Sequence, residues 1–159
     1  MAGILKQQSG KSSITLSGKT ISIVVAEWNE EITEALCTGA REALLRAGVR
    51  RKNIRIVWVP GSFELPLAAL WEAEKKKVAA VICLGCVIQG DTPHFDYVCQ
   101  GVTQGTMDVM LRTRKPVAFG VLTTLNKKQA LERAGGKLGN KGEEAAATVI
   151  QMLEVQHGK

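Results

Sequence analysis

Four apolar runs, separated by stretches with helical periodicity, constrain the fold of this chain more than any other feature. The runs are rich in Val, Ile, Leu and Ala and lie at 20–26, 54–59, 79–87 and 117–123. Runs of this kind are typical of parallel strands that are buried on both faces. Strands that alternate with helices predict right-handed crossovers and one parallel sheet between two helical layers. We therefore expect an α/β fold, a three-layer α/β/α sandwich around a four-stranded parallel sheet.

The expected helices occupy the segments between and after these runs. Their bounds are 30–47, 63–77, 96–112, 126–134 and 142–155. The apolar stripe of 96–112 consists mostly of Gly and Val, which predicts close packing against a neighbouring element. No strand is expected between the last two helices. Ile14–Leu16 is a candidate edge strand, within a flexible or strand-exchanging arm at 1–18 that could add a strand to a neighbouring subunit, and 19–156 is expected to form one domain.

Length and composition restrict the class of protein. With 159 residues, 45% hydrophobic and 23% charged, the chain has the composition of a globular protein and not of a disordered one. The longest apolar run, 78–88, is too short to span a bilayer. Residues 1–18 are polar and lack the apolar core of a signal peptide. We expect a soluble cytoplasmic protein without a membrane partner, and the sequence leaves open whether a targeting peptide preceded it.

The positive charge and the cysteines both favour ordinary structural roles. The formal net charge is +6, but the basic clusters are short and have no interleaved aromatic residues, so we expect solvated surface charge and no nucleic-acid partner. Nucleic-acid binding remains the weakest alternative. Cys83 and Cys86 form a C-x-x-C inside an apolar run with no second pair nearby. Because zinc needs four ligands, we interpret both as small buried hydrophobic residues and expect no metal site.

Polar and aromatic side chains follow the expected strands at the points where they end. Trp28 follows the first strand, Glu64 the second and His94 the third. The carboxyl ends of parallel strands meet at one edge of a sheet, where ligands bind. A histidine there is suited to proton transfer near neutral pH. Each residue also has a structural interpretation: packing for Trp28, complementing a helix dipole for Glu64, and a solvent-facing helix start for His94.

The turn Gly90-Asp91-Thr92 leads into a helix and offers free backbone N–H groups to an anion. The chain contains neither G-x-x-x-x-G-K-[ST] nor a G-x-G-x-x-G after a strand, which argues against a nucleoside triphosphate or a dinucleotide. A small phosphorylated compound fits better. Arg133 and Lys137 supply further positive charge, although basic residues followed by glycine are also ordinary helix C-caps.

Four segments together resemble the 6,7-dimethyl-8-ribityllumazine synthase family. They are Val59-Pro60-Gly61-Ser62-Phe63-Glu64-Leu65-Pro66, Gly90-Asp91-Thr92-Pro93-His94-Phe95-Asp96-Tyr97, Phe119-Gly120-Val121-Leu122-Thr123-Thr124, and the stretch from Gln129 through Arg133 to Gly142. The likeness extends over about residues 21–152. It implies a flavodoxin-like sandwich that condenses 5-amino-6-(D-ribitylamino)uracil with 3,4-dihydroxy-2-butanone 4-phosphate, the penultimate step of riboflavin biosynthesis. Phosphate and water leave, and the resemblance implies no cofactor and no metal.

The resemblance also implies the roles of individual residues. His94 would transfer protons, Trp28 would stack on the pyrimidine, and Glu64 would accept hydrogen bonds from the ribityl hydroxyls. The residues expected to bind ribitylaminouracil are Trp28, Ser62, Phe63, Glu64, Cys86, Val87, Ile88 and Phe119. The residues expected to bind the butanone phosphate are Asp91, Thr92, Arg133 and Lys141. Glu27, Gln89 and Asp91 depart from the usual pattern, since Arg is common at 27 and Arg or Lys at 89.

The same resemblance implies a homopentamer in which Phe119 and Arg133 reach the site of a neighbouring subunit. Some members assemble further into an icosahedral shell, and riboflavin synthase is the expected functional partner. Two other functions fit this fold: a flavin- or lumazine-binding protein without catalysis, and a shell-forming structural protein. His94 and Arg133 favour the enzyme over the first of these.

Overall fold

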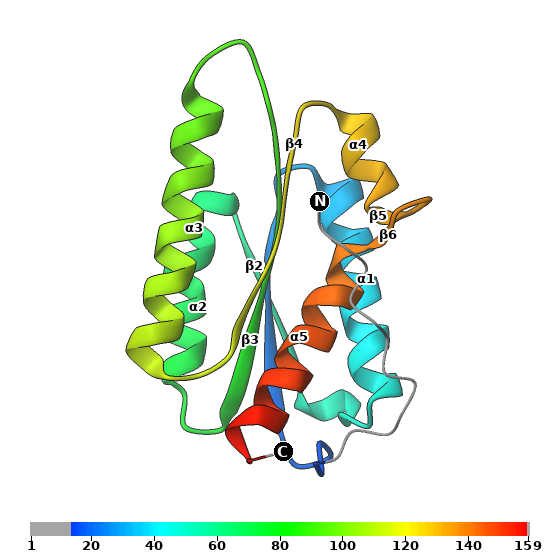
Figure 1. Cartoon of the computed structure of the whole chain (residues 1–159), viewed down its shortest axis with the longest axis vertical. Coiled ribbons are helices and arrows are strands. Elements are labelled where there is room, and N and C mark those ends of the chain that lie inside the picture. Colours follow the sequence, from blue (N-terminus) through cyan, green and yellow to red (C-terminus); the bar gives the residue numbers. More distant parts are fainter. Residues whose placement is uncertain (1–13, 159) are drawn as a thin grey trace.

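A four-stranded parallel sheet forms the centre of the molecule (Figure 1). The computed structural model describes residues 14–158. The strand order is β2-β1-β3-β4, and all three neighbouring pairs are parallel. The strands are β1 (Thr20–Ala26), β2 (Ile54–Val59), β3 (Val78–Ile88) and β4 (Val117–Thr124). The expected α/β fold is therefore confirmed, and the strand bounds differ from the expected ones by at most one residue.

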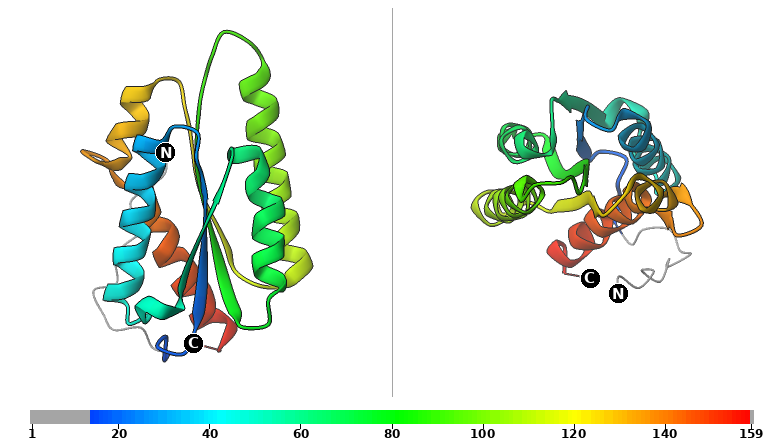
Figure 2. Two further views of the ribbon diagram at one scale, coloured as in Figure 1. Left: turned by 180° about the vertical axis from the view of Figure 1, so that it is seen from behind. Right: turned by 90° about the horizontal axis from the view of Figure 1, so that it is seen from above.

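Helices cover both faces of this sheet, so that three layers result (Figure 2). The α-helices are α1 (Glu30–Arg46), α2 (Leu65–Glu74), α3 (His94–Thr113), α4 (Lys127–Glu132) and α5 (Lys141–Gln156). Two single turns of 3-10 helix, η1 (Arg51–Asn53) and η2 (Ser62–Glu64), precede β2 and α2. Helices α2 and α3 lie on one face, and α1, α4 and α5 lie on the other. Among the described residues, no helix has the length and apolar character needed to cross a bilayer.

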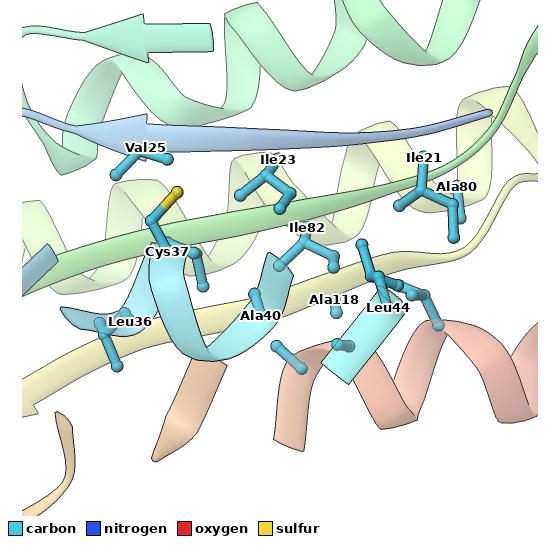
Figure 3. Close-up of a cluster of buried hydrophobic side chains, with 14 of the residues drawn as sticks. Ile21, Ile23, Val25, Leu36, Cys37, Ala40, Leu44, Ala80, Ile82 and Ala118 are labelled. Carbon is cyan, nitrogen blue, oxygen red and sulfur yellow. The ribbon is translucent and has the colours of Figure 1, made fainter. Parts of the chain in front are cut away.

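Each face of the sheet has its own hydrophobic core. Ile21, Ile23 and Ile82 turn toward α1 and α5 (Figure 3). Neighbouring residues of the same strands, Val24, Val81 and Cys83, turn toward α2 and α3. This alternation follows from the two-residue period of a strand. It also separates Cys83 from Cys86, which lie three positions apart and point into opposite cores. One ion could not bind both thiols, and the interpretation of both as small buried hydrophobic residues is confirmed. Burial raises the pKa of Cys83 to about 12 and that of Cys86 to about 11.

The sheet edge at β2 differs from the expectation of a strand buried on both faces. Ile56 is 39% exposed and Trp58 is 41% exposed. The reason is topological: β2 is one of the two edge strands of the sheet and has a neighbour on one side only. An apolar run therefore predicted the strand correctly but not its position within the sheet.

Two further segments differ from the expected pattern of strands within the chain. Within the chain, Ile14–Leu16 forms no strand, and Leu16 is buried in the core beneath α1 and α5. Residues 1–13 of the expected arm lie outside the described residues, and addition of a strand to a neighbouring subunit stays a prediction. A short antiparallel hairpin, β5 (Ala134–Gly136) and β6 (Gly139–Asn140), stands between α4 and α5, where we expected no strand. Gly135 and Gly139 have φ values of 107° and 81°, a backbone conformation that residues with a side chain rarely adopt. Glycine at these two positions therefore permits the turn.

Helix α3 packs closely on η2 and α2, as its stripe of small residues predicted. A Cβ atom at Gly101 would overlap Cε2 of Phe63, and one at Gly105 would lie 2.8 Å from Cβ of Pro66. Neither position has room for a side chain unless its neighbour moves. The absence of a side chain at Gly101 therefore determines where the Phe63 ring can lie.

A buried carboxylate joins α2 to the first two strands. Glu72 is 4% exposed, and its Oε2 accepts hydrogen bonds from Ser22 Oγ at 2.7 Å and from Arg55 Nε at 2.9 Å. Lys75 Nζ pairs with the other carboxylate oxygen. Burial acts to raise the pKa of Glu72, but hydrogen bonds from Arg55, Lys75 and Ser22 outweigh it and lower the pKa from 4.5 to about 2. Glu72 is thus held as a carboxylate.

Candidate active site

The candidate site lies at the carboxyl edge of the sheet, between β1 and β3. These two strands are neighbours, but β1 leads into α1 on one face and β3 leads into α3 on the other (Figures 1 and 2). In a parallel sheet such a divergence opens a crevice in which ligands bind. The loops after β1, β2 and β3 all reach this edge.

Trp28 and Glu64 meet at this edge beside Gly61. A Cβ atom at Gly61 would lie 3.6 Å from Cδ1 of Trp28 and 3.0 Å from Oε2 of Glu64. The Trp28 side chain is 70% exposed, so a large apolar surface faces solvent next to a carboxylate. The backbone holds this arrangement, since the Glu27 N–H donates to the Val59 carbonyl at 2.8 Å and the Trp28 N–H to the Pro60 carbonyl at 3.2 Å.

Ser62 and Phe63, which precede Glu64, point in different directions. Ser62 is only 6% exposed, and its hydroxyl packs against the backbone of Gly85 in β3 without a hydrogen-bond partner among the described residues. Phe63 is exposed and lies across Gly101 of α3. Phe63 therefore connects the edge after β2 with the helix that follows β3.

The end of β3 extends past the end of β1. Cys86, Val87 and Ile88 are paired with β4, whereas the pairing of β3 with β1 ends at Leu84. The Gln89 N–H donates to the Thr124 carbonyl of β4 at 2.9 Å. In a strand, the N–H and C=O of one residue point to the same side, and those of the next residue point to the opposite side. Since Gln89 points toward β4, the N–H and C=O of Cys86 and Ile88 point toward the β1 side. No strand of the described chain covers the N–H and C=O of Ile88.

The turn after β3 presents Asp91, Thr92 and His94 to solvent. His94 is the first residue of α3, and Pro93 precedes it as the N-cap. Free N–H groups and the positive end of the dipole of a 20-residue helix therefore lie beside these three side chains. The geometry suits an anion, with a histidine next to it.

Within the described chain, no hydrogen bond or ion pair joins Phe119, Arg133 or Lys141 to Trp28, Glu64 or His94. Phe119 is paired with Cys83 in mid-strand, five residues before Thr124, which is a distance of about 16 Å along β4. Arg133 donates from Nη1 to the Gln129 carbonyl at 2.9 Å, and Lys141 forms an ion pair with Glu144. Arg133 is the C-cap of α4 and Lys141 is the first residue of α5, two helices on the α1 face, whereas α3 begins on the opposite face.

Sequence comparisons identify the family. The model of the 6,7-dimethyl-8-ribityllumazine synthase family matches residues 18–157. The chain belongs to this family. Relatives named 6,7-dimethyl-8-ribityllumazine synthase come from Cytophaga hutchinsonii, with 61% identity over 87% of each chain, and from Porphyromonas gingivalis, with 57% identity over 86% of this chain and 84% of the relative. A relative from Thermus thermophilus is 46% identical over 95% of this chain and 96% of its own.

One residue at this edge of the lumazine synthase family member was not predicted from its sequence. Asn29, directly after Trp28, donates from Nδ2 to the Cys86 carbonyl at 2.9 Å. Asparagine between a strand and a helix predicts an ordinary N-cap, but Asn29 makes no side-chain cap hydrogen bond. Its position next to Trp28 was the only signal available. Within residues 14–158, no group of three or more His, Cys, Asp or Glu side chains is placed to hold a metal ion.

Proposed function

We propose that this member of the lumazine synthase family condenses 5-amino-6-(D-ribitylamino)uracil with 3,4-dihydroxy-2-butanone 4-phosphate in the crevice between β1 and β3. The observation that carries the proposal is the meeting of the exposed Trp28 ring and the Glu64 carboxylate at Gly61. The uncovered peptide of Ile88 lies at the end of the strand next to β1. An aromatic face, a carboxylate and a backbone edge are what a polyhydroxylated heterocycle needs.

The first substrate would use each of these groups. The Trp28 ring would stack on the pyrimidine, because offset stacking favours flat aromatic partners. The N–H and C=O of Ile88, with the backbone of Cys86 and Val87, would bind the uracil edge, whose amides offer matching donors and acceptors. Glu64 would accept hydrogen bonds from ribityl hydroxyls, with Ser62 and Phe63 lining the same segment.

The phosphate of the second substrate would bind at the start of α3. Free N–H groups at a helix N-terminus attract anions, and the Thr92 hydroxyl adds a donor. The Asp91 side chain would point away, because its charge repels phosphate, while its backbone still contributes. His94 is exposed and would exchange protons with the reactants during amine attack, dehydration and loss of phosphate.

Positioning would contribute more to catalysis than proton transfer. Holding two reactants together can supply about 7–11 kcal/mol of a reaction barrier. A single acid–base residue typically contributes about 10²–10⁴-fold in rate, which is about 3–5 kcal/mol. The proposed roles follow this division, with most residues assigned to binding and His94 alone to proton transfer.

Phe119, Arg133 and Lys141 would complete the site from a neighbouring subunit of a homopentamer. This part of the proposal is supported by the mid-strand position of Phe119 and by the ends of α4 and α5 that carry Arg133 and Lys141 on the face opposite α3. It is also supported by exposed apolar side chains on β2 and α2, including Trp58 and Trp71, which are typical of a protein interface. Assembly into an icosahedral shell, a functional partnership with riboflavin synthase and a cytoplasmic location stay predictions.

The direct test is to mix the two substrates with the protein and to follow lumazine absorbance and fluorescence. Trp28→Ala should reduce product formation strongly, because it removes the exposed ring proposed to stack on the pyrimidine. Tight binding of lumazine without turnover would instead support the non-catalytic binding protein. Formation of a shell without either property would support the structural role.

Sharing of sites between subunits has its own test. Trp28→Ala and Arg133→Ala should damage opposite halves of each shared site. When the two inactive variants are unfolded and reassembled together, some interfaces should contain both intact halves, and activity should return. Native-sized mixed oligomers without activity would show that each subunit carries a complete site, and would reject the role of Arg133 across the interface.

A further inference from the structure

Asn29 has an unusual backbone conformation for its place in the fold. Its φ and ψ are 61° and 46°, in the left-handed region, which asparagine tolerates better than most residues. Its backbone carbonyl accepts from the Ile32 N–H at 2.8 Å and from the Thr33 N–H at 3.1 Å, and so begins α1. The side chain takes no part in capping. It is directed to β3 instead.

The side-chain amide of Asn29 joins the loop after β1 to the end of β3, at the point where the two strands separate. Cys86 turns its carbonyl toward the β1 side, but β1 ends at Ala26. The next two backbone N–H groups, of Glu27 and Trp28, donate to Val59 of β2 and to Pro60 directly after it. The Asn29 Nδ2 donates to the Cys86 carbonyl at 2.9 Å in their place. The three residues 27–29 are thereby bonded to both neighbouring strands.

We propose that Asn29 is a positioning residue for the heterocyclic substrate; this inference rests on the proposed function. Its amide fixes the end of β3 relative to the segment that carries Trp28. A flat heterocycle must meet the Trp28 ring with its face and the Ile88 peptide with its edge at the same time. Both groups contribute fully only when their separation and angle are fixed beforehand.

Two substitutions at Asn29 separate positioning from stability. Asn29→Gly keeps the left-handed backbone without strain and removes only the amide. It should raise the KM for ribitylaminouracil by about tenfold, the effect expected from one hydrogen bond, and leave the KM for butanone phosphate unchanged. Asn29→Asp keeps the shape and places a favourable negative charge at the start of α1, so it should preserve the thermal midpoint and still weaken heterocycle binding.

The matched control is Asn53, which also donates from its side chain to a backbone carbonyl, that of Ser17, at 2.8 Å. Asn53 lies before β2, at the opposite end of the sheet from the site. Asn53→Ala removes a bond of the same kind and should leave both KM values unchanged. Product affinity, measured by quenching of tryptophan fluorescence, gives a second readout that needs no turnover.

Selective loss of heterocycle affinity in both Asn29 variants, with Asn53→Ala unaffected, would support the proposal. Wild-type affinity in Asn29→Gly and Asn29→Asp would overturn it. A parallel change of both KM values and of the thermal midpoint would also overturn it, because that pattern indicates a purely structural role. Failure of the wild-type protein to form lumazine would reject the proposed function instead, and product titration would still decide the effect of Asn29 on binding.

Discussion

Replacing Glu72 by Gln should destabilise the protein strongly at neutral pH and less strongly in acid. The carboxylate of Glu72 accepts hydrogen bonds from Ser22 and Arg55 and pairs with Lys75, in a nearly buried position. Glutamine has almost the same shape but no charge. The variant therefore leaves the packing intact and removes the negative charge that Ser22, Arg55 and Lys75 stabilise.

The size of the effect follows from the pKa of Glu72, which is lowered from 4.5 to about 2. A difference of this size corresponds to about 3 kcal/mol of folding stability at pH 7. Because the folded pKa is the lower one, this stability is complete above the unfolded value and is lost as the pH falls from about 4.5 toward 2. At pH 3.5 the contribution should have decreased to about 2 kcal/mol.

Urea unfolding of the wild-type and Glu72→Gln proteins at equal concentration, from pH 7 to pH 3.5, measures this difference. Other carboxylates titrate in both proteins, so their effects cancel in the comparison. Glu31→Gln serves as the control, because Glu31 pairs with Lys127 at 2.6 Å on the surface and should contribute less than about 1 kcal/mol. A wild-type advantage that stays constant down to pH 3.5 would refute the linkage to Glu72.

Three further predictions concern the site. His94→Ala should slow turnover by about 10²-fold without abolishing it. If the variant turned over as fast as the wild-type protein between pH 6 and 8, His94 would have no part in the mechanism. Binding of lumazine should quench the fluorescence of Trp28, so the quench should vanish in Trp28→Ala and persist in Trp71→Ala; persistence in both would exclude stacking at Trp28. Gly101→Ala should displace the Phe63 ring and raise the KM for ribitylaminouracil while the fold is retained, which circular dichroism and steady-state kinetics can check.

The sequence predicted the sheet well because its strands are the most apolar segments of the chain. The bounds of β1 and β2 agree with the expected ones. The order of the strands was not contained in these runs, so β2 was expected to be buried although it forms an edge. The loops that carry Trp28, Glu64 and His94 were predictable for the same reason as the strands, since strand ends fix where the following residues lie.

The features that the sequence did not predict depend on contacts between distant segments. The hairpin β5–β6 has only three and two residues per strand and carries no apolar pattern. Glu72 resembles a solvent-facing helical residue until Ser22 and Arg55 are placed beside it by the pairing of β1 with β2. Asn29 resembles a helix cap until the end of β3 comes within reach of its amide. No local pattern encodes such pairings.

The overhang of β3 beyond β1 has a consequence for how this family can change over evolutionary time. A peptide N–H and C=O at position 88 are present whichever amino acid is encoded there, so most codon changes leave that edge chemically intact. Only proline would delete the donor. Selectivity that depends on strand length is therefore robust to point mutation. To alter the proposed binding edge, β3 would have to be shortened or shifted, because replacing its side chains would leave the same backbone groups uncovered at position 88.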